Sequence, residues 1–204
     1  MSRTLARTLL LALALAGLHS APACAQRRAG LSMPRVWLSA WAGRFVDFGG
    51  FSDDQNTFFQ FDDATAFGGS VHVRPGQLAQ FGVDVVWSRP PYQRFDRETV
   101  EVMSSGDATT LAALASLRLA GGGGPLALYL SGAAGAFFWN LEELGGRETD
   151  PAFTLGIGLD YGLAGNAVLF GEYGQWWVYH QKDDTVQKNT ANHTLFRVGL
   201  RYGF

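Results

Sequence analysis

Charged residues recur inside segments that are otherwise apolar, and they are the first candidates for chemistry. The acidic ones are Asp84, Asp160 and Glu172, and the basic ones are His72, Arg74, Arg118, Arg197 and Arg201. Charges enclosed in protein are costly unless they are paired. They therefore form either a salt-bridge network or a path for protons or ions, and we favour the network. The expected partners of Glu172 and Asp160 are Arg197, Arg201 or Arg118.

A second group of residues could support acyl transfer. His180 and His193 flank a polar segment that holds Asp183 and Asp184, and an earlier polar segment holds Ser104 and Ser105. A serine nucleophile needs a histidine base and an acid that orients the histidine. No local spacing ties these residues together, and no serine lies at a matching distance from His180 in its own segment. We favour solvated loop residues and predict no catalytic site.

Two further patterns could bind ions. Asp53, Asp54, Asp62 and Asp63 offer oxygen ligands for a hard cation, but they lack the spacing and the fixed glycine of a calcium loop. The run Gly121–Gly124 lacks the Gly-Lys-Ser/Thr ending of a phosphate-binding loop. We therefore expect a solvated acidic loop and a turn, with no metal site and no cofactor.

The last ten residues alternate strictly between two faces of a predicted strand. One face carries Phe196, Val198, Leu200, Tyr202 and Phe204, and the other carries two arginines and two glycines. A period of two indicates a strand with two different environments. An unbroken apolar face opposite a polar one is typical of a transmembrane barrel, although a soluble edge strand shows the same alternation.

Seven more segments have the length and pattern of strands. The apolar stretch between Leu111 and Trp139 is long enough for a membrane helix, but four glycines and Pro125 divide it into two strands. The predicted strands are Val36–Phe48, Thr65–Arg74, Leu78–Arg89, Asp107–Ala120, Leu126–Asn140, Ala152–Leu163, Ala167–His180 and His193–Phe204.

Short and long connections alternate between these strands. The short ones are rich in turn-forming residues and lie at 75–77, 121–125 and 164–166. The long ones are mostly polar and lie at 49–64, 90–106, 141–151 and 181–192. Outer-membrane barrels combine short periplasmic turns with long outer loops. The sequence thus predicts an all-β fold, an eight-stranded antiparallel up-and-down transmembrane β-barrel with both termini on the periplasmic side.

Alternation assigns the faces of most strands, with the charged residues named above inside. The first strand is ambiguous, and there we prefer Arg44 inside with Trp37, Trp41 and Phe45 outside. Two aromatic girdles are expected. One contains Trp87, Trp139, Trp177 and Tyr179, and the other contains Trp37, Tyr202 and Phe204.

The N-terminal segment reads as an export signal. Arg3 and Arg7 precede a short apolar run, and Ala23-Cys24-Ala25 reads as a cleavage site. We predict a signal peptide at 1–25 and a barrel domain at 26–204. The only cysteine is lost with the signal, so no disulfide is expected. The chain has 16 basic and 18 acidic residues, a balance that argues against nucleic acid as a partner.

With Phe204 behind Tyr202 and Leu200, the export signal and eight strands, the chain resembles the small outer-membrane β-barrel family. This family includes the transmembrane domain of OmpA-like proteins and the opacity-type surface proteins. The resemblance is one of pattern over the whole mature chain, and the terminal aromatic is its only sharp motif. It implies that Leu200, Tyr202 and Phe204 help the barrel-assembly machinery to recognise the last strand. The peptidoglycan-binding domain of full-length OmpA-like proteins is not expected, because the chain ends at that strand.

The resemblance also implies a monomer in the outer membrane, in contact with membrane lipid and lipopolysaccharide. An eight-stranded barrel is just wide enough for side chains to fill. We therefore expect a structural or surface-exposed role without an open pore. The alternatives are a narrow channel for ions or small apolar solutes and a lipid A-modifying enzyme of the outer membrane. A soluble periplasmic barrel that binds a ligand is the alternative outside the membrane.

Overall fold

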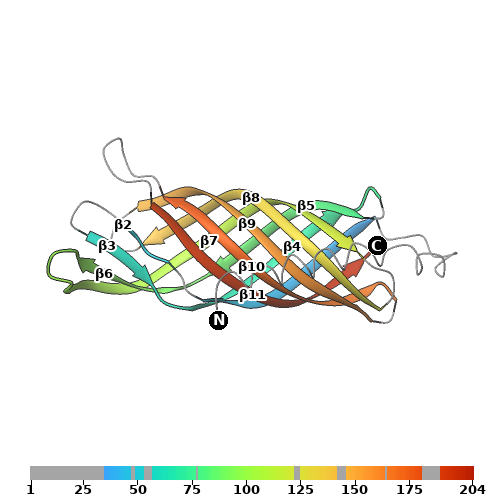
Figure 1. Ribbon diagram of the computed structural model, residues 1–204, viewed down its shortest axis with the longest axis horizontal. Helices are drawn as coiled ribbons and strands as arrows, with labels where there is room; N and C mark the ends of the chain where they lie inside the picture. The colour runs from blue at the N-terminus through green and yellow to red at the C-terminus, as the bar shows by residue number, and fades with distance from the viewer. Residues whose placement is uncertain are drawn as a thin grey trace, which may run out of the picture.

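The computed structural model describes residues 35–46, 49–52, 57–76, 78–121, 125–141, 146–163, 165–180 and 189–204, and these residues form one closed barrel (Figure 1). The predicted export signal and its cleavage site lie outside the described residues, as do Asp53, Asp54, Asp183 and Asp184. Among the residues that the structure describes, no helix is long and apolar enough to cross a membrane.

The described elements are all strands. They are β1 (Val36–Val46), β2 (Phe51–Ser52), β3 (Thr57–Phe61), β4 (Ala64–Val73), β5 (Ala79–Ser88), β6 (Pro91–Asp96), β7 (Val102–Gly121), β8 (Leu126–Leu141), β9 (Gly146–Gly162), β10 (Ala167–His180) and β11 (Asn189–Gly203).

Eight of these strands close the barrel. In the ring each pairs antiparallel with its neighbours in the order β1, β4, β5, β7, β8, β9, β10 and β11. The ring closes where β11 pairs with β1, from Trp37 opposite Gly203 to Val46 opposite Thr194. The predicted eight-stranded up-and-down barrel is therefore confirmed.

The other three strands continue the wall at one end of the barrel, which we call the loop end. β3 leads into β4, β6 continues β5, and β6 pairs with the first residues of β7 (Figure 1). The prediction of loops at 49–64 and 90–106 was therefore wrong in part. These segments form strands because their aromatic residues Phe59, Phe61 and Tyr92 are buried over the barrel interior. The opposite end, where the chain ends at Phe204, we call the turn end.

The face assignment of the first strand was also wrong. Trp37, Trp41 and Phe45 are buried inside the barrel, with Phe45 fully enclosed, whereas the Arg44 side chain is 60% exposed on the outside. The interior contains aromatic rings as well as charges, so apolar character alone does not mark the outer face. For the same reason Trp37 and Trp139, both buried, belong to neither aromatic girdle.

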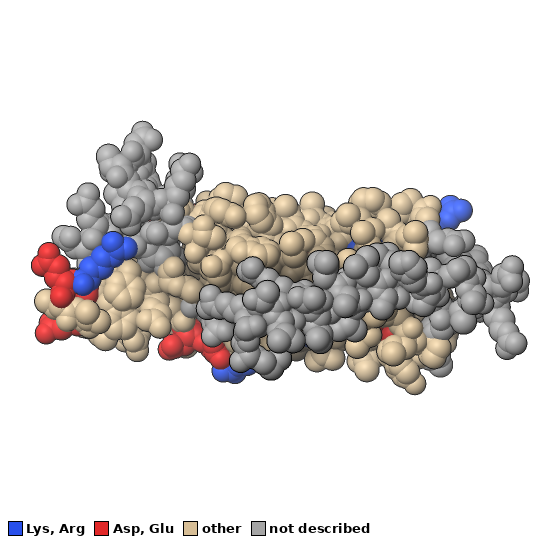
Figure 2. Space-filling model, in the orientation of Figure 1, with Lys and Arg blue, Asp and Glu red and all other residues tan. Residues whose placement is uncertain are grey.

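The outer wall is apolar along most of the barrel. Every strand of the ring contributes exposed large apolar residues. They include the three predicted C-terminal residues Leu200, Tyr202 and Phe204. On the side drawn in Figure 2, charged side chains gather toward the loop end, and the visible middle of the wall is mostly uncharged. Such a band is the surface that a barrel presents to lipid.

Candidate functional site: the barrel interior

The turn-end half of the interior holds all six residues of the predicted charge network. We use the name lumen network for Asp84, Arg118, Asp160, Glu172, Arg197 and Arg201. Arg118 contacts Asp160 at 2.5 Å, and Arg201 lies 3.5 Å from the other oxygen of that carboxylate. Arg197 donates to Glu172 at 2.7 Å. The structure thus brings the expected acids and arginines together.

Strand register explains the contact between Arg197 and Glu172. Glu172 on β10 lies directly opposite Arg197 on β11, and both side chains point inward. Arg197 also reaches Asp84 across the interior, at 3.6 Å. Arg197 therefore links two carboxylates that come from opposite walls of the barrel, β10 and β5.

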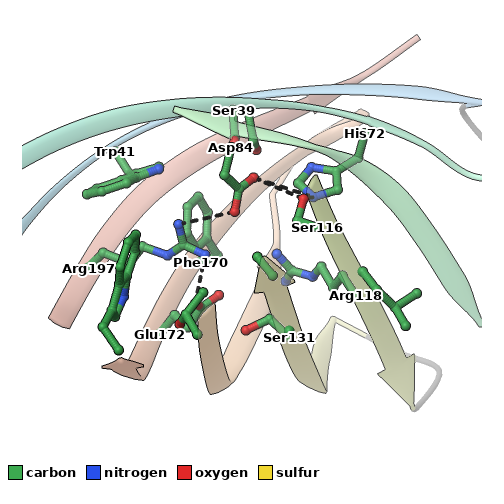
Figure 3. Close-up of a pocket in the computed structure, with 16 residues that line it drawn as sticks. Ser39, Trp41, His72, Asp84, Ser116, Arg118, Ser131, Phe170, Glu172 and Arg197 are labelled. Carbon is green, nitrogen blue, oxygen red and sulfur yellow. Dashed lines mark hydrogen bonds and ion pairs between the residues drawn. The ribbon is translucent and has the colours of Figure 1, made fainter. Parts of the chain in front are cut away.

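A serine and a histidine extend the network beyond the predicted pairs. Ser116 Oγ donates to Asp84 Oδ1 at 3.3 Å and lies 3.0 Å from His72 Nε2. His72 is itself 3.6 Å from Asp84. Figure 3 shows Asp84 between this pair and Arg197. Arg74, also predicted to lie in the lumen, donates from Nε to the carbonyl of Gly76 in the turn after β4.

Two interior partners were missed by sequence reasoning. The Tyr129 ring lies under the Arg118 guanidinium at 3.1 Å, and Gln80 Oε1 accepts a hydrogen bond from Arg201 at 3.0 Å. The sequence analysis assigned no face to Tyr129, because its segment is almost wholly apolar. Its spacing of eight and ten residues from Phe137 and Trp139, which are also inside, is the signal that could have placed it.

The loop-end half of the interior is filled by rings. Seven buried side chains form this aromatic layer: Phe45, Phe59, Phe61, Tyr92, Phe137, Trp139 and Trp176. Ring centroids are 4.6 Å apart for Phe137 and Trp139 and 4.9 Å apart for Phe61 and Trp139. Edge-to-face and tilted contacts at these distances are favourable. The layer thus covers the lumen network on its loop-end side.

A cavity of about 20 Å³ lies within the polar half, between Ser39, His72, Ser131 and Glu172 among other residues (Figure 3). A polar cavity of this size has room for an ordered water molecule. It offers hydroxyl, imidazole, carboxylate and guanidinium groups to such a water. Buried side chains of the lumen network and Trp176 of the aromatic layer are among the residues that surround this cavity.

The histidines considered for catalysis have structural partners. His180 Nδ1 is 2.9 Å from Asp150, which also accepts a hydrogen bond from Trp139 Nε1 at 2.8 Å, and His180 Nε2 is 3.5 Å from Glu148. His193 Nδ1 accepts a hydrogen bond from the Gly49 amide at 3.1 Å.

The candidate serines and the acidic segment lie elsewhere. Ser104 and Ser105 lie on β7, which is not a neighbour of β10 in the ring. Asp62 and Asp63 lie in the short connection between β3 and β4, and Asp63 pairs with Arg44 at 3.6 Å. In the described part of the chain, no three His, Cys, Asp or Glu residues are grouped as metal ligands.

Comparison with known proteins finds similarity in structure. No family model matches the sequence, and no curated protein matches it. Neisserial surface protein A is similar, with a TM-score of 0.57, 19% identity, and coverage of 83% of this chain and 97% of that one. The outer membrane protein OprG from Pseudomonas aeruginosa has a TM-score of 0.55, 13% identity, and coverage of 84% and 97%. This chain therefore has the fold of the small outer-membrane β-barrels.

Proposed function

We propose that this chain is an integral outer-membrane protein with a structural and surface-exposed role, and that its barrel holds no water-filled pore. The apolar outer wall and the similarity to an outer-membrane protein and a surface protein support this location. In this arrangement the turn end faces the periplasm and the loop end faces outward.

The filled interior is the observation that carries the proposal. The lumen network occupies one half of the barrel and the aromatic layer the other, and the cavity within the polar half is about 20 Å³. A conducting pore needs a continuous column of water, and this volume holds about one molecule. A packed interior also links opposite walls and so strengthens the barrel.

Planar-bilayer recording tests the absence of a pore. The folded protein, verified by a mobility difference between unboiled and boiled samples on a gel, should give no discrete conductance steps. A porin inserted under the same conditions is the positive control. Reproducible single-channel steps from the folded protein would contradict the proposal.

Fractionation tests the location. We propose that residues 1–25 direct export and are removed, so the mature protein should begin at Gln26 and be recovered with the outer membrane. N-terminal sequencing of the membrane fraction checks both points. Recovery of the protein in the soluble periplasmic fraction would contradict them.

A narrow path for small apolar solutes is the second candidate, and the aromatic layer favours it. An interior lined by rings attracts an apolar solute more than an ion. Uptake of such a solute into vesicles above the rate of protein-free vesicles would support this function.

We do not propose an enzyme. His180 has carboxylates rather than a serine hydroxyl beside its ring nitrogens, with Asp150 2.9 Å from Nδ1 and Glu148 3.5 Å from Nε2. Incubation of the folded protein with lipid A in detergent should release no fatty acid and transfer no acyl chain.

A further inference from the structure

Two arginine–aspartate pairs lie on the outer face of one wall, where the apolar band ends. Arg44 on β1 pairs with Asp63 at 3.6 Å, and Arg89, directly after β5, pairs with Asp107 on β7 at 3.4 Å. All four side chains are exposed. Neither pair belongs to the lumen network, and the proposed function does not use them.

Strand register places the two arginines on either side of the same residue. Arg44 lies opposite Thr65 on β4, and Ser88, the residue before Arg89, lies opposite Ala66, the residue after Thr65. Adjacent strands are about 4.8 Å apart, so the two arginine backbones are roughly 10 Å apart. Arg44, Thr65 and Arg89 therefore form one short row across three neighbouring strands, all on the outside.

The surface below this row is aromatic and then aliphatic. Phe67 and Trp87 lie opposite each other, one step toward the turn end, and their rings are stacked at 6.1 Å. Both are more than 40% exposed, and Val85 continues the apolar wall. Asp63 and Asp107 lie on the other side of the row, toward the loop end. From the turn end toward the loop end, the outer face of this wall thus carries aliphatic side chains, then aromatic rings, then guanidinium groups and then carboxylates.

Arg44 and Arg89 both have terminal amino groups that can donate further hydrogen bonds. Each ion pair uses the arginine Nε, so within the described residues neither pair of terminal amino groups has a partner. An exposed ion pair of this kind contributes little stability, so a ligand can compete with the carboxylate at little cost. Guanidinium groups bind phosphate oxygens through two parallel hydrogen bonds.

We propose that this row is a binding site for the phosphorylated headgroup of a lipid in the outer leaflet. Arg44 and Arg89 donate from their terminal nitrogens to phosphate oxygens, and the lipid chains begin along Phe67 and Trp87. An amphiphile with an anionic head and apolar chains matches the order of groups along the wall. The proposal rests on the outer-membrane location proposed above.

Titration of the folded protein in a neutral detergent tests this site. The probes are diphosphoryl lipid A, the same lipid without phosphates, and inorganic phosphate, with binding measured by native mass spectrometry. We expect the diphosphoryl lipid to bind most tightly. Each arginine near a membrane surface contributes about 1 kcal/mol toward anionic lipid, so Arg44→Gln/Arg89→Gln should weaken that binding roughly thirtyfold.

Two further variants make the test specific. Arg35→Gln/Arg97→Gln removes the same charge from the turn end and from the β6–β7 connection, and it should bind like the unmodified protein. Asp63→Asn/Asp107→Asn, measured with a chelator, should bind the diphosphoryl lipid more tightly, because it removes the carboxylates that compete for the guanidinium groups.

Three results would overturn the site: equal binding of the dephosphorylated lipid, equal loss in the two arginine double variants, or equal competition by inorganic phosphate. A mobility-shift gel of each sample separates this failure from that of the proposed function. A folded barrel without phosphate preference rejects only the site, whereas a chain that forms no barrel in lipid rejects both.

Discussion

Three buried arginines share one environment, a carboxylate at the edge of the guanidinium and an aromatic ring over its face. The pairs are Asp160 and Tyr129 for Arg118, Glu172 and Trp41 for Arg197, and Asp160 and Trp37 for Arg201. The edge forms hydrogen bonds and the face is attracted to the ring, so two kinds of contact hold each guanidinium. Among the described residues, the Nε atoms of all three arginines are buried without a hydrogen-bond partner. Arginine suits this position better than lysine, whose ammonium group has no flat face.

Removing the charge of Glu172 from the buried Glu172–Arg197 pair should lower the stability of the barrel. Glu172→Gln leaves Arg197 with a single full countercharge, that of Asp84, and should lower the free energy of unfolding by about 3 kcal/mol. Urea unfolding in lipid vesicles measures this value. Glu101→Gln removes an exposed carboxylate near the loop end and is the control, expected to change little. An equal effect of the two substitutions would show that the lumen network does not stabilise the barrel.

One glycine makes room for the ring below Arg118. A Cβ at Gly158 would lie 2.2 Å from Tyr129 Cζ, so Gly158→Ala must displace the ring and should destabilise the barrel by about 1–3 kcal/mol. Gly171→Ala on the adjacent strand is the matched control, because a Cβ there meets nothing within 4 Å. Vesicle unfolding of both variants should separate them clearly. Similar stability would mean that the ring is loosely held.

A single strand, β11, serves two environments at once. Arg197 and Arg201 point into the lumen network, and Val198 and Leu200 between them point to the apolar outside. β1 has the same division with different chemistry, since its inward residues are mainly aromatic. The polarity of the inner and outer faces therefore has to be determined separately for each strand.

The outer face of β11 should be sensitive to charge according to depth. Val198→Arg should cost about 2–4 kcal/mol if the residue lies near the middle of the lipid, whereas Thr190→Arg, on the same face but nearer the loop end, should cost little. Val198→Leu controls for the change in size. Unfolding in vesicles measures all three. Equal tolerance at the two arginine positions would refute the assignment of this face to lipid.

Sequence reasoning succeeded where polar and apolar residues alternate and failed where both faces are apolar. Strands β9 and β11 alternate clearly, so Asp160 and Arg197 could be placed inside. In β1 and β8, rings such as Trp41 and Trp139 fill the interior while alanine and leucine face outward, and composition does not tell the two faces apart. Sequence reasoning named Arg118 as one of three possible partners of Asp160. The structure selects Arg118 and Arg201, because strand register and depth in the barrel decide between the three arginines.

At the scale of the whole molecule, the lumen network and the aromatic layer lie one after the other along the barrel axis. If the barrel holds no pore, as we propose, we expect the charges of the lumen network to oppose apolar solutes and the rings of the aromatic layer to oppose ions. Neither layer alone accounts for both exclusions. The extended wall at the loop end, formed with β3 and β6, encloses the second layer.

Opening one layer should therefore not produce a channel. Phe137→Ala/Trp139→Ala removes two large rings and should lower stability, since each truncation of a buried aromatic costs about 3–5 kcal/mol. Conductance in planar bilayers should nevertheless stay at the background level, because the lumen network still closes the other half. A mobility-shift gel confirms that the variant is folded. Discrete conductance steps would mean that the aromatic layer is the only barrier.

The pairing of β11 with β1 makes the chain suitable for circular permutation. The Phe204 amide donates to the Val36 carbonyl at 2.9 Å, and the Arg35 amide donates to the Phe204 carbonyl at 2.9 Å. The first and last described residues are thus as close as the two sides of a hairpin. A few glycines between them would form a fourth short turn, and new ends could be placed between β10 and β11. Such a circular permutant keeps every strand pairing of the barrel, but Phe204 no longer lies at the end of the chain. Its stability and its rate of assembly therefore measure two roles of Phe204 separately: the contacts of the side chain in the folded barrel, and any recognition of a terminal aromatic residue during assembly.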